Sequence, residues 1–177
     1  MTPRIEPGRL RELGPVNWAV ARAGSKASGV PDMHLFSTLG RAGGLFRGWL
    51  FYSGRLMPFG RLPRHDTELV ILRVAHVRNC GYEFDHHTRL GRRAGVTPEI
   101  LDRVRTGPSA DGWSAKHRAL LTAVDQLVET DDIDDAIWAE LAQHYDERRL
   151  IEIVLLVTQY DGLATTIGTL RIERDFG

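Results

Sequence analysis

The sequence predicts an all-α protein, a bundle of helices joined by short loops. After residue 32, apolar residues recur at intervals of three and four along most of the chain, which is the period of one helix face. Residues typical of helix starts and stops stand between these segments. The stretch from Leu150 to Val157 is apolar nearly all round, as in a buried central helix, and no neighbouring stretch would pair with it as a strand.

The composition is that of an ordinary folded domain. Apolar residues make up 42% of the 177 residues and charged residues 26%, and 23 basic side chains balance 23 acidic ones. Because the two signs are interspersed, the sequence argues against a nucleic-acid-binding protein. A single cysteine excludes an intrachain disulfide. No signal segment opens the chain, and its longest strongly apolar run, Ile153 to Val157, is short, so we expect a soluble, cytoplasmic protein without membrane contact.

The chain is expected to have two parts. These are an N-terminal extension, residues 1–31, and one helical domain, residues 32–177. Within the extension, Leu10 to Ala23 predict a helix interrupted at Gly14, and residues 24–31 are expected to form a loop. Asp32 is expected to cap the next helix. A further apolar segment at 45–57 and a turn at 58–63 follow.

The remaining helices are marked by their ends. The clearest one covers about 64–77, and Asn79 is the predicted N-cap of the next, about 80–94, which Gly95 ends. His65 and Asp66 stand where the first of these helices starts. Later helix starts are predicted at these positions: Thr97, Ser114, the acidic residues 131–135, and near Glu147.

One segment carries side chains suited to chemistry. Cys80, Glu83 and His87 stand at i, i+3 and i+7 of one helix, so all three project from one face. Cys80 lies at the helix N-terminus, where unpaired amides and the helix dipole favour a thiolate. Glu83 and His87 can share a hydrogen bond that orients the imidazole. An acid, a thiol and an imidazole on one face suit general acid–base catalysis.

Each of these residues also has an ordinary structural interpretation. A lone Cys80 is often a small core residue, Glu83 with His87 can be a surface helical pair, and Glu68 in a first turn can serve the helix dipole. His76 and His86 are expected to be structural or solvent-facing. The sequence shows no serine-nucleophile elbow and no phosphate-binding loop.

A zinc site is a further alternative, since Cys, Glu and His on one helical face can hold a metal. Structural zinc prefers several cysteines, and the His-Glu-x-x-His helix pattern is missing. We therefore predict no metal and no other cofactor.

The stretch from Leu62 to Arg103 resembles the core of carboxymuconolactone decarboxylase-like and alkylhydroperoxidase D-like (AhpD-like) proteins. It matches in a Glu-Leu pair at Glu68, a Cys-x-Tyr-Glu-x-x-x-His motif that starts at Cys80, and Ala-Gly-Val-Thr-Pro-Glu-Ile from Ala94. Residues 158–164 resemble the final helix of that family. The resemblance implies an AhpD-like helical bundle that forms a homo-oligomer, as a trimer, hexamer or dimer.

The resemblance also assigns positions. The peroxidase branch of the family uses a Cys-x-x-Cys pair, a His four residues after the second Cys, and a Glu twelve residues before the first. Cys80 matches the first Cys, Glu83 the second, His87 the His, and Glu68 the distant Glu. Glu83 cannot form a disulfide, so a self-contained dithiol cycle is not available, and peroxidase activity would need an external thiol.

From this resemblance we expect a lyase of the carboxymuconolactone decarboxylase type, using acid–base chemistry on a small organic acid or lactone. His87 would be the general acid–base group and Glu83 its orienting partner. Glu68 would supply a second carboxylate, Cys80 a pocket thiol that can react, and Tyr82 a hydroxyl for the substrate.

Two further points stay open in the sequence. Arg73 or Arg78 would bind a substrate carboxylate, and the sequence does not choose between them. The alternative functions are a one-cysteine thiol-dependent peroxidase or redox sensor, an oxidoreductase with peroxiredoxin-type activity, and a non-catalytic helical oligomer.

Overall fold

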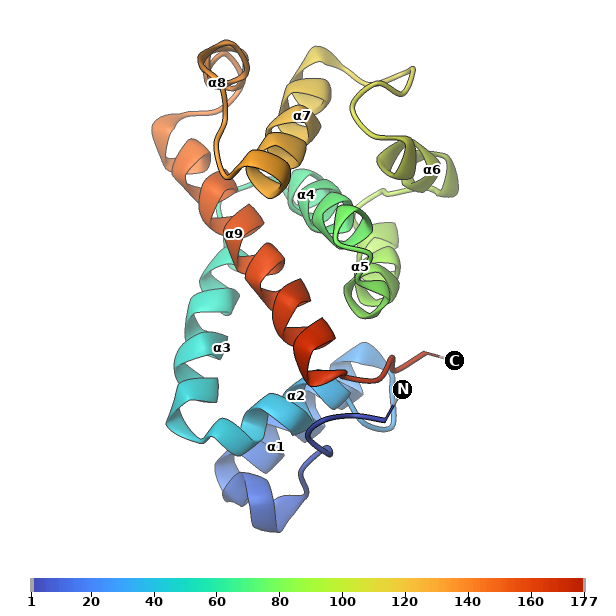
Figure 1. The fold of residues 1–177 in the computed structure, drawn as a ribbon, viewed down its shortest axis with the longest axis vertical. Coiled ribbons are helices and arrows are strands. Elements are labelled where there is room, and N and C mark those ends of the chain that lie inside the picture. Colours follow the sequence, from blue (N-terminus) through green and yellow to red (C-terminus); the bar gives the residue numbers. More distant parts are fainter. Residues whose placement is uncertain (1, 177) are drawn as a thin grey trace.

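The computed structural model describes residues 2–176, and these residues form helices and no strands (Figure 1). This confirms the predicted all-α fold. The helices in chain order are α1 (Leu10–Ser28), α2 (His34–Leu39), the short 3-10 helix η1 (Gly40–Ala42), α3 (Gly44–Leu56), α4 (Arg64–Val77), α5 (Gly81–Arg93), α6 (Pro98–Thr106), α7 (Ala115–Thr130), α8 (Asp135–Ala142) and α9 (Glu147–Leu170).

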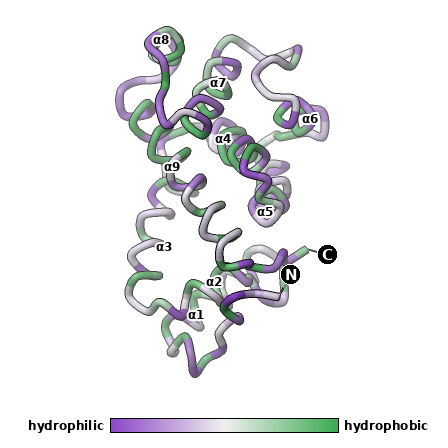
Figure 2. Tube along the Cα trace, in the orientation of Figure 1, coloured by the Kyte–Doolittle hydropathy of each residue, from purple (hydrophilic) through white to green (hydrophobic). Residues whose placement is uncertain are grey.

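Helix α9 runs diagonally through the molecule, with α3 on one side and α4, α5 and α7 on the other (Figure 1). By length and composition alone it is apolar enough to cross a membrane. In the structure, however, Ile153, Leu156 and Val157 are almost completely buried against other helices. Figure 2 shows apolar positions on α4, α7 and α9 where these helices meet. Helix α9 is therefore placed as the core helix of the bundle.

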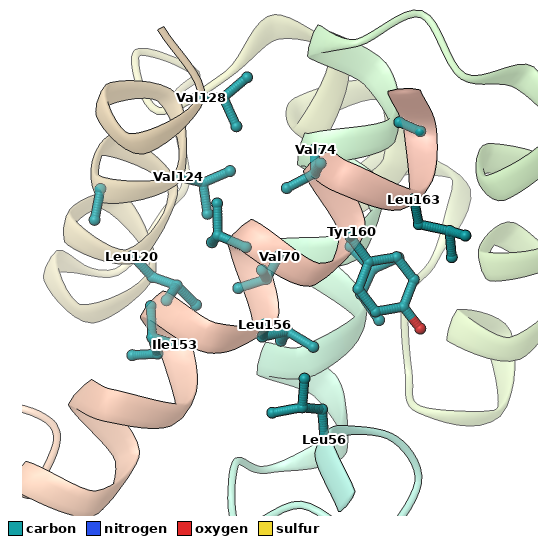
Figure 3. Close-up of a cluster of buried hydrophobic side chains, with 14 of the residues drawn as sticks. Leu56, Val70, Val74, Leu120, Val124, Val128, Ile153, Leu156, Tyr160 and Leu163 are labelled. Atoms are coloured by element: carbon teal, nitrogen blue, oxygen red, sulfur yellow. The ribbon is translucent and has the colours of Figure 1, made fainter. Parts of the chain in front are cut away.

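The main core is built where α4, α7 and α9 pack together. Val70 and Val74 of α4 face Leu120 and Val124 of α7, and Leu156 of α9 lies among them (Figure 3). These apolar side chains recur at three and four residues on their helices, so each helix presents one continuous stripe to the others. Removing these stripes from water is the main favourable contribution to the fold.

Helix α4 is enclosed on almost every side. All ten residues from Asp66 to Ala75 are buried, because α5, α6, α7 and α9 surround the helix. Burying a charge is costly unless it is paired and hydrogen-bonded, so each charged side chain on this stretch needs a partner. Asp66, Glu68 and Arg73 all have one.

Asp66 shows how such a charge is accommodated. Its carboxylate accepts a hydrogen bond from the Tyr145 hydroxyl at 2.9 Å and contacts Lys116 Nζ at 2.6 Å and His117 Nε2 at 3.1 Å. Burial acts to raise the pKa of Asp66, but these partners lower it to about 2. Asp66 is therefore more than a helix-start residue, since it ties α4 to α7 and to the segment before α9.

The N-terminal region differs from the prediction in two places. Helix α1 kinks at Gly14, where φ is +70°, and then continues to Ser28 through residues expected to form a loop. Gly24 lies in this additional helical stretch. A Cβ at this position would come within 2.7 Å of the Phe36 ring, so only a glycine allows α1 and α2 to pack this closely. Asp32 does not cap α2. Met33 is the N-cap, and Asp32 accepts a hydrogen bond from Ser37 Oγ instead.

The turn between α4 and α5 also differs. Asn79 is not the N-cap of α5 but adopts a left-handed conformation, φ +52°, and Cys80 occupies the N-cap. Asparagine tolerates this conformation better than most residues, which explains its presence after the end of α4. The predicted caps Thr97 and Ser114 are confirmed, since their side chains accept hydrogen bonds from backbone amides three residues later.

Two substitutions test the role of α9. Leu156 is completely buried, whereas Thr158 on the same helix is exposed. We expect Leu156→Ala to lower the free energy of unfolding by about 2–5 kcal/mol, because it leaves a cavity in the core. Thr158→Ala is the control and should cost less than about 1 kcal/mol. Urea unfolding of the two variants measures both values, and equal losses would contradict this placement of α9.

Candidate active site

A cavity of about 280 Å³ lies between α3, α5 and α9, with α2 at one end. Most of its wall is apolar and aromatic: Met33, Leu35, Phe36, Trp49, Leu50, Met57, Leu90 and Leu163. Its polar groups come mainly from α5 and α9: Glu83, His86, His87, Gln159 and Tyr160. An apolar cavity with a few convergent polar groups is the usual form of a small-molecule site.

His87 is fixed in the cavity wall by Glu68. Its Nδ1 lies 2.8 Å from Glu68 Oε2, and the Arg64 Nε donates to the other carboxylate oxygen at 2.8 Å. Burial acts to raise the pKa of the fully buried Glu68, but the hydrogen bond from His87 and the positive charge of Arg64 lower it overall. Glu68 is therefore ionised at neutral pH.

This ionisation determines which ring nitrogen of a neutral His87 carries the proton. A carboxylate only accepts hydrogen bonds, so Nδ1 must carry the proton that it donates to Glu68. In the neutral imidazole, Nε2 then has a free lone pair. It forms no hydrogen bond with residues 2–176, and His87 lines the cavity, so Nε2 is available as a proton acceptor.

Glu83 has the opposite environment. Its side chain is buried in the cavity wall, and apart from a contact with the Cys80 thiol neither carboxyl oxygen has a hydrogen-bond partner among the described residues. Burial raises the pKa of Glu83 to about 8, with a smaller contribution from Asp161, while the Cys80 thiol opposes the rise. Glu83 is thus mostly protonated at neutral pH. It does not orient His87 as predicted, because Glu68 occupies that role.

Cys80 does not line the cavity. It opens, with 7% exposure, onto surface clefts that Asn79, Gly81 and Arg174 also line. Burial and then the negative charge of Glu83 raise the pKa of Cys80 to about 12, against the effect of the backbone amides at the helix start. The predicted thiolate is therefore wrong, because burial outweighs the helix N-terminus.

Tyr82 keeps its hydroxyl for internal contacts. The hydroxyl donates to Asp175 Oδ2 at 2.6 Å and accepts from the backbone N–H of Leu35 at 3.2 Å, so it is not free for a substrate as predicted. His86 Nε2 lies 2.9 Å from the same Asp175 oxygen, and its ring stacks on Tyr82. Asp175 thus holds α5 and the start of α2 together, and Tyr82 contributes its ring to the cavity wall.

Tyr160 of α9 is a residue that the site prediction missed. Its ring meets His87 edge to face, with centroids 5.2 Å apart, and Figure 3 shows its hydroxyl pointing away from the apolar core. The hydroxyl makes no hydrogen bond with a described residue. Burial, followed by the charges of Glu83 and Glu68, raises its pKa. Its place in the Thr158 to Asp161 stretch, which resembles the family's final helix, was the available signal.

The two arginines considered for substrate binding serve the fold instead. Arg73 forms a two-point ion pair with Asp125 of α7, at 2.6 and 2.8 Å, and donates to the Val104 carbonyl of α6. Arg78 pairs with Asp161 of α9. Among residues 2–176, no lysine or arginine lines the cavity. The prediction that one of them binds a substrate carboxylate is therefore wrong.

The described part of the chain contains no preformed cluster of metal ligands. No group of three or more His, Cys, Asp or Glu side chains there is arranged to hold a metal ion. Each of the two histidines in the cavity wall instead has its own carboxylate partner, which is Glu68 for His87 and Asp175 for His86.

Sequence comparisons find one matching family and one similar protein. The carboxymuconolactone decarboxylase family matches residues 44–126, a range that contains Glu68, Cys80, Glu83 and His87. The uncharacterized protein YdfG of Bacillus subtilis (strain 168) is 26% identical over 98 residues, which are 54% of this chain and 67% of YdfG.

Solved structures show the same fold over the whole chain. A peroxidase-related protein from Ralstonia eutropha JMP134 with an alkylhydroperoxidase AhpD core has a TM-score of 0.85 at 18% identity, covering 98% of this chain and 93% of its own. The debrominase Bmp8, as a cysteine-to-alanine variant in complex with 2,3,4-tribromopyrrole, has a TM-score of 0.80 at 16% identity, covering 99% and 94%. A peroxidase-related protein from Silicibacter sp. TM1040 has a TM-score of 0.80 at 15% identity, covering 98% and 94%.

Replacing Glu83 by Gln tests the raised pKa. Between about pH 4.5 and 8, the folded chain keeps a proton on Glu83 that the unfolded chain has released, so the wild-type stability falls as pH rises, by at most about 1.4 kcal/mol per pH unit. Glu83→Gln lacks this ionisation. Its free energy of unfolding relative to the wild type should therefore increase from about pH 5 to about pH 8.5.

Urea unfolding at the two pH values measures this difference. The control is Glu140→Gln, at an exposed position of α8. It should change stability by the same small amount at both pH values. A Glu83→Gln difference that is also independent of pH would contradict the raised pKa.

Proposed function

We propose that this chain, which belongs to the AhpD-like superfamily, is an acid–base enzyme that transfers protons on a small organic substrate. One observation carries the proposal: the same apolar cavity holds a protonated carboxyl group, Glu83, and an imidazole with a free nitrogen, His87. Two titratable groups whose environments separate their protonation states are the usual basis for dividing acid and base roles.

The two groups have complementary tasks. His87 Nε2 takes a proton from carbon or oxygen, and the ionised Glu68 stabilises the imidazolium that results. Glu83 donates a hydrogen bond or a proton to the group that becomes negative. This chemistry suits a lactone or a related carbonyl compound, where removal of a proton or loss of carboxylate leaves an enolate that must be protonated again. A lyase of the carboxymuconolactone decarboxylase type uses such an enolate, but its substrate carboxylate would find no lysine or arginine among the described residues that line this cavity.

The position of Cys80 favours acid–base chemistry over a thiol-dependent peroxidase. A peroxidase needs a thiolate that meets the peroxide, whereas Cys80 is a buried thiol with a pKa near 12 and lies outside the cavity. The debrominase Bmp8, which has a similar fold, binds the small aromatic molecule 2,3,4-tribromopyrrole. This supports a small, compact substrate for the present cavity. With one unpaired cysteine, the enzyme is expected to act in the cytoplasm.

Two substitutions separate these functions. On a lactone or carbonyl substrate identified by screening, His87→Ala should lower kcat at least about 100-fold, since general acid–base groups typically contribute that much. Cys80→Ser should keep most of the activity, because the thiol does not face the cavity. Steady-state kinetics of purified variants measure both effects. Wild-type turnover by His87→Ala would overturn the proposal. Loss of turnover in Cys80→Ser would also contradict it and would favour the thiol-dependent alternative.

We also propose that the chain forms a homo-oligomer, as the family resemblance implies. A groove between α3 and α9 is lined by the exposed apolar side chains Tyr52, Phe59, Ile151 and Leu155. Phe59 is 74% exposed and Ile151 60%, which is unusual for large apolar residues unless another surface covers them. A second copy of the chain is the occupant that this proposal assigns.

A double substitution tests this assembly. Phe59→Asp with Ile151→Asp should convert the oligomer to a monomer, because it places charges in the apolar contact. Trp138→Asp on α8, where the tryptophan is 41% exposed, is the control and should leave the mass unchanged. Light scattering after size-exclusion chromatography gives the mass. A wild-type chain that is already monomeric would overturn the proposal.

A further inference from the structure

The cavity wall carries two hydrogen-bond donors that nothing in the described chain uses. Glu83 is 3% exposed, and its carboxyl oxygens lack hydrogen-bond partners. Tyr160 is 8% exposed, and its hydroxyl has no partner among residues 2–176 either. Buried polar groups are nearly always hydrogen-bonded in folded proteins, so the unpartnered Glu83 carboxyl group, with the Tyr160 hydroxyl on the same cavity wall, indicates a ligand.

The two donors lie close to each other and to His87. Tyr160 contacts the His87 ring, with centroids 5.2 Å apart, and Glu83 stands one helical turn before His87 on α5. The charge that Glu83 would carry is near enough to act on the Tyr160 hydroxyl. The three groups therefore converge on one region of the cavity, with both donors beside the imidazole.

We propose that Glu83 and Tyr160 together bind the carbonyl oxygen of an uncharged ketone, lactone or ester, while His87 removes a proton from the adjacent carbon. The assignment rests on the acid–base function proposed above and adds the class of substrate. In this assignment the hydrogen bond from Glu83 goes to the carbonyl oxygen of the substrate. Glu83 and Tyr160 together form an oxyanion-binding pair.

The step is balanced with the groups present. His87 Nε2 accepts the proton, and the electrons of the broken C–H bond form a C=C bond as those of the carbonyl move to oxygen. The enolate oxygen receives hydrogen bonds from the protonated Glu83 and the Tyr160 hydroxyl. Return of the proton to the same or a conjugated carbon completes the reaction, so neither an oxidant nor a reductant is needed. Donors aimed at a developing oxyanion in an apolar site stabilise it far more than water does.

The residues that line the cavity also argue against a substrate that is bound through a carboxylate. No lysine or arginine from the described residues reaches the cavity, and most of the wall is apolar. A substrate carboxylate would be removed from water without a strong cationic partner, which is costly. A protonated Glu83 can donate to a neutral carbonyl, whereas it offers no charge to an anion. An uncharged carbonyl compound therefore fits the wall better than an organic acid.

Two probes of similar shape test the substrate class. β-Tetralone is an uncharged bicyclic ketone with acidic α-protons, and β-naphthoate is a bicyclic anion of similar size. Calorimetric titration of the full chain should show that the ketone binds at least about tenfold more tightly than the anion, a difference of about 1.4 kcal/mol. Equal affinities, tighter binding of naphthoate, or no binding of the ketone would overturn the proposal.

The infrared carbonyl band of bound β-tetralone tests the donor pair. Tyr160→Phe and Glu83→Leu each remove one donor, so each should move the band to higher frequency and weaken binding about fivefold. Glu83→Gln keeps a donor amide, so it is the conservative variant and should retain the band position. Glu83→Met also lacks a donor and replaces Glu83→Leu if the leucine variant fails to fold. Tyr52→Phe, outside the cavity on α3, is the control for Tyr160→Phe. An unchanged band in both Tyr160→Phe and the folded Glu83 variant without a donor would overturn the pair.

Deuterium exchange separates this assignment from the acid–base function on which it rests. In D₂O, the wild type should place deuterium on the α-carbon of β-tetralone faster than buffer alone, and His87→Ala should lose this acceleration. A shifted carbonyl band without enzyme-catalysed exchange would support the donor pair and overturn the base role of His87. Exchange that depends on His87 but leaves the carbonyl band unaffected by both donor substitutions would overturn the pair and support the base.

Discussion

The buried hydrogen bond between Glu68 and His87 is the interaction on which the site depends. Helix α4 is enclosed by four other helices, so the Glu68 carboxylate has no access to water. Its charge is tolerated there because His87 and Arg64 donate to its two oxygens. The same contact fixes the imidazole ring against α4 and leaves its second nitrogen for the cavity. Packing and proton chemistry thus share one buried hydrogen bond.

Two glutamates in this small region have opposite protonation states for a clear physical reason. Glu68 is completely buried, yet it is ionised because two donors hold its oxygens. Glu83 is buried without such donors, so burial raises its pKa and keeps its proton. Burial alone therefore does not determine the charge of a carboxyl group, since the available hydrogen-bond partners decide the outcome. This contrast gives the cavity an acid and a base at the same pH.

The sequence located the chemical segment but not the pairing within it. Helical spacing placed Glu83 and His87 on one face and suggested that they bond to each other, whereas the structure gives His87 to Glu68, nineteen residues away. Spacing within one helix cannot show a partner on a neighbouring helix that lies closer. For the same reason the sequence placed Cys80 on the face of His87, whereas in the structure Cys80 opens onto surface clefts and not onto the cavity that His87 lines.

The sequence by itself determined the all-α class, most helix boundaries and the segment from Glu68 to His87, because helix period, capping residues and motif spacing are local properties. Tertiary structure decided what those residues do. It brought Tyr160 of α9 against His87, assigned the Tyr82 hydroxyl to Asp175, and kept arginines out of the cavity. These outcomes depend on which helix faces meet and how far water is excluded between them, and neither property is local in the chain.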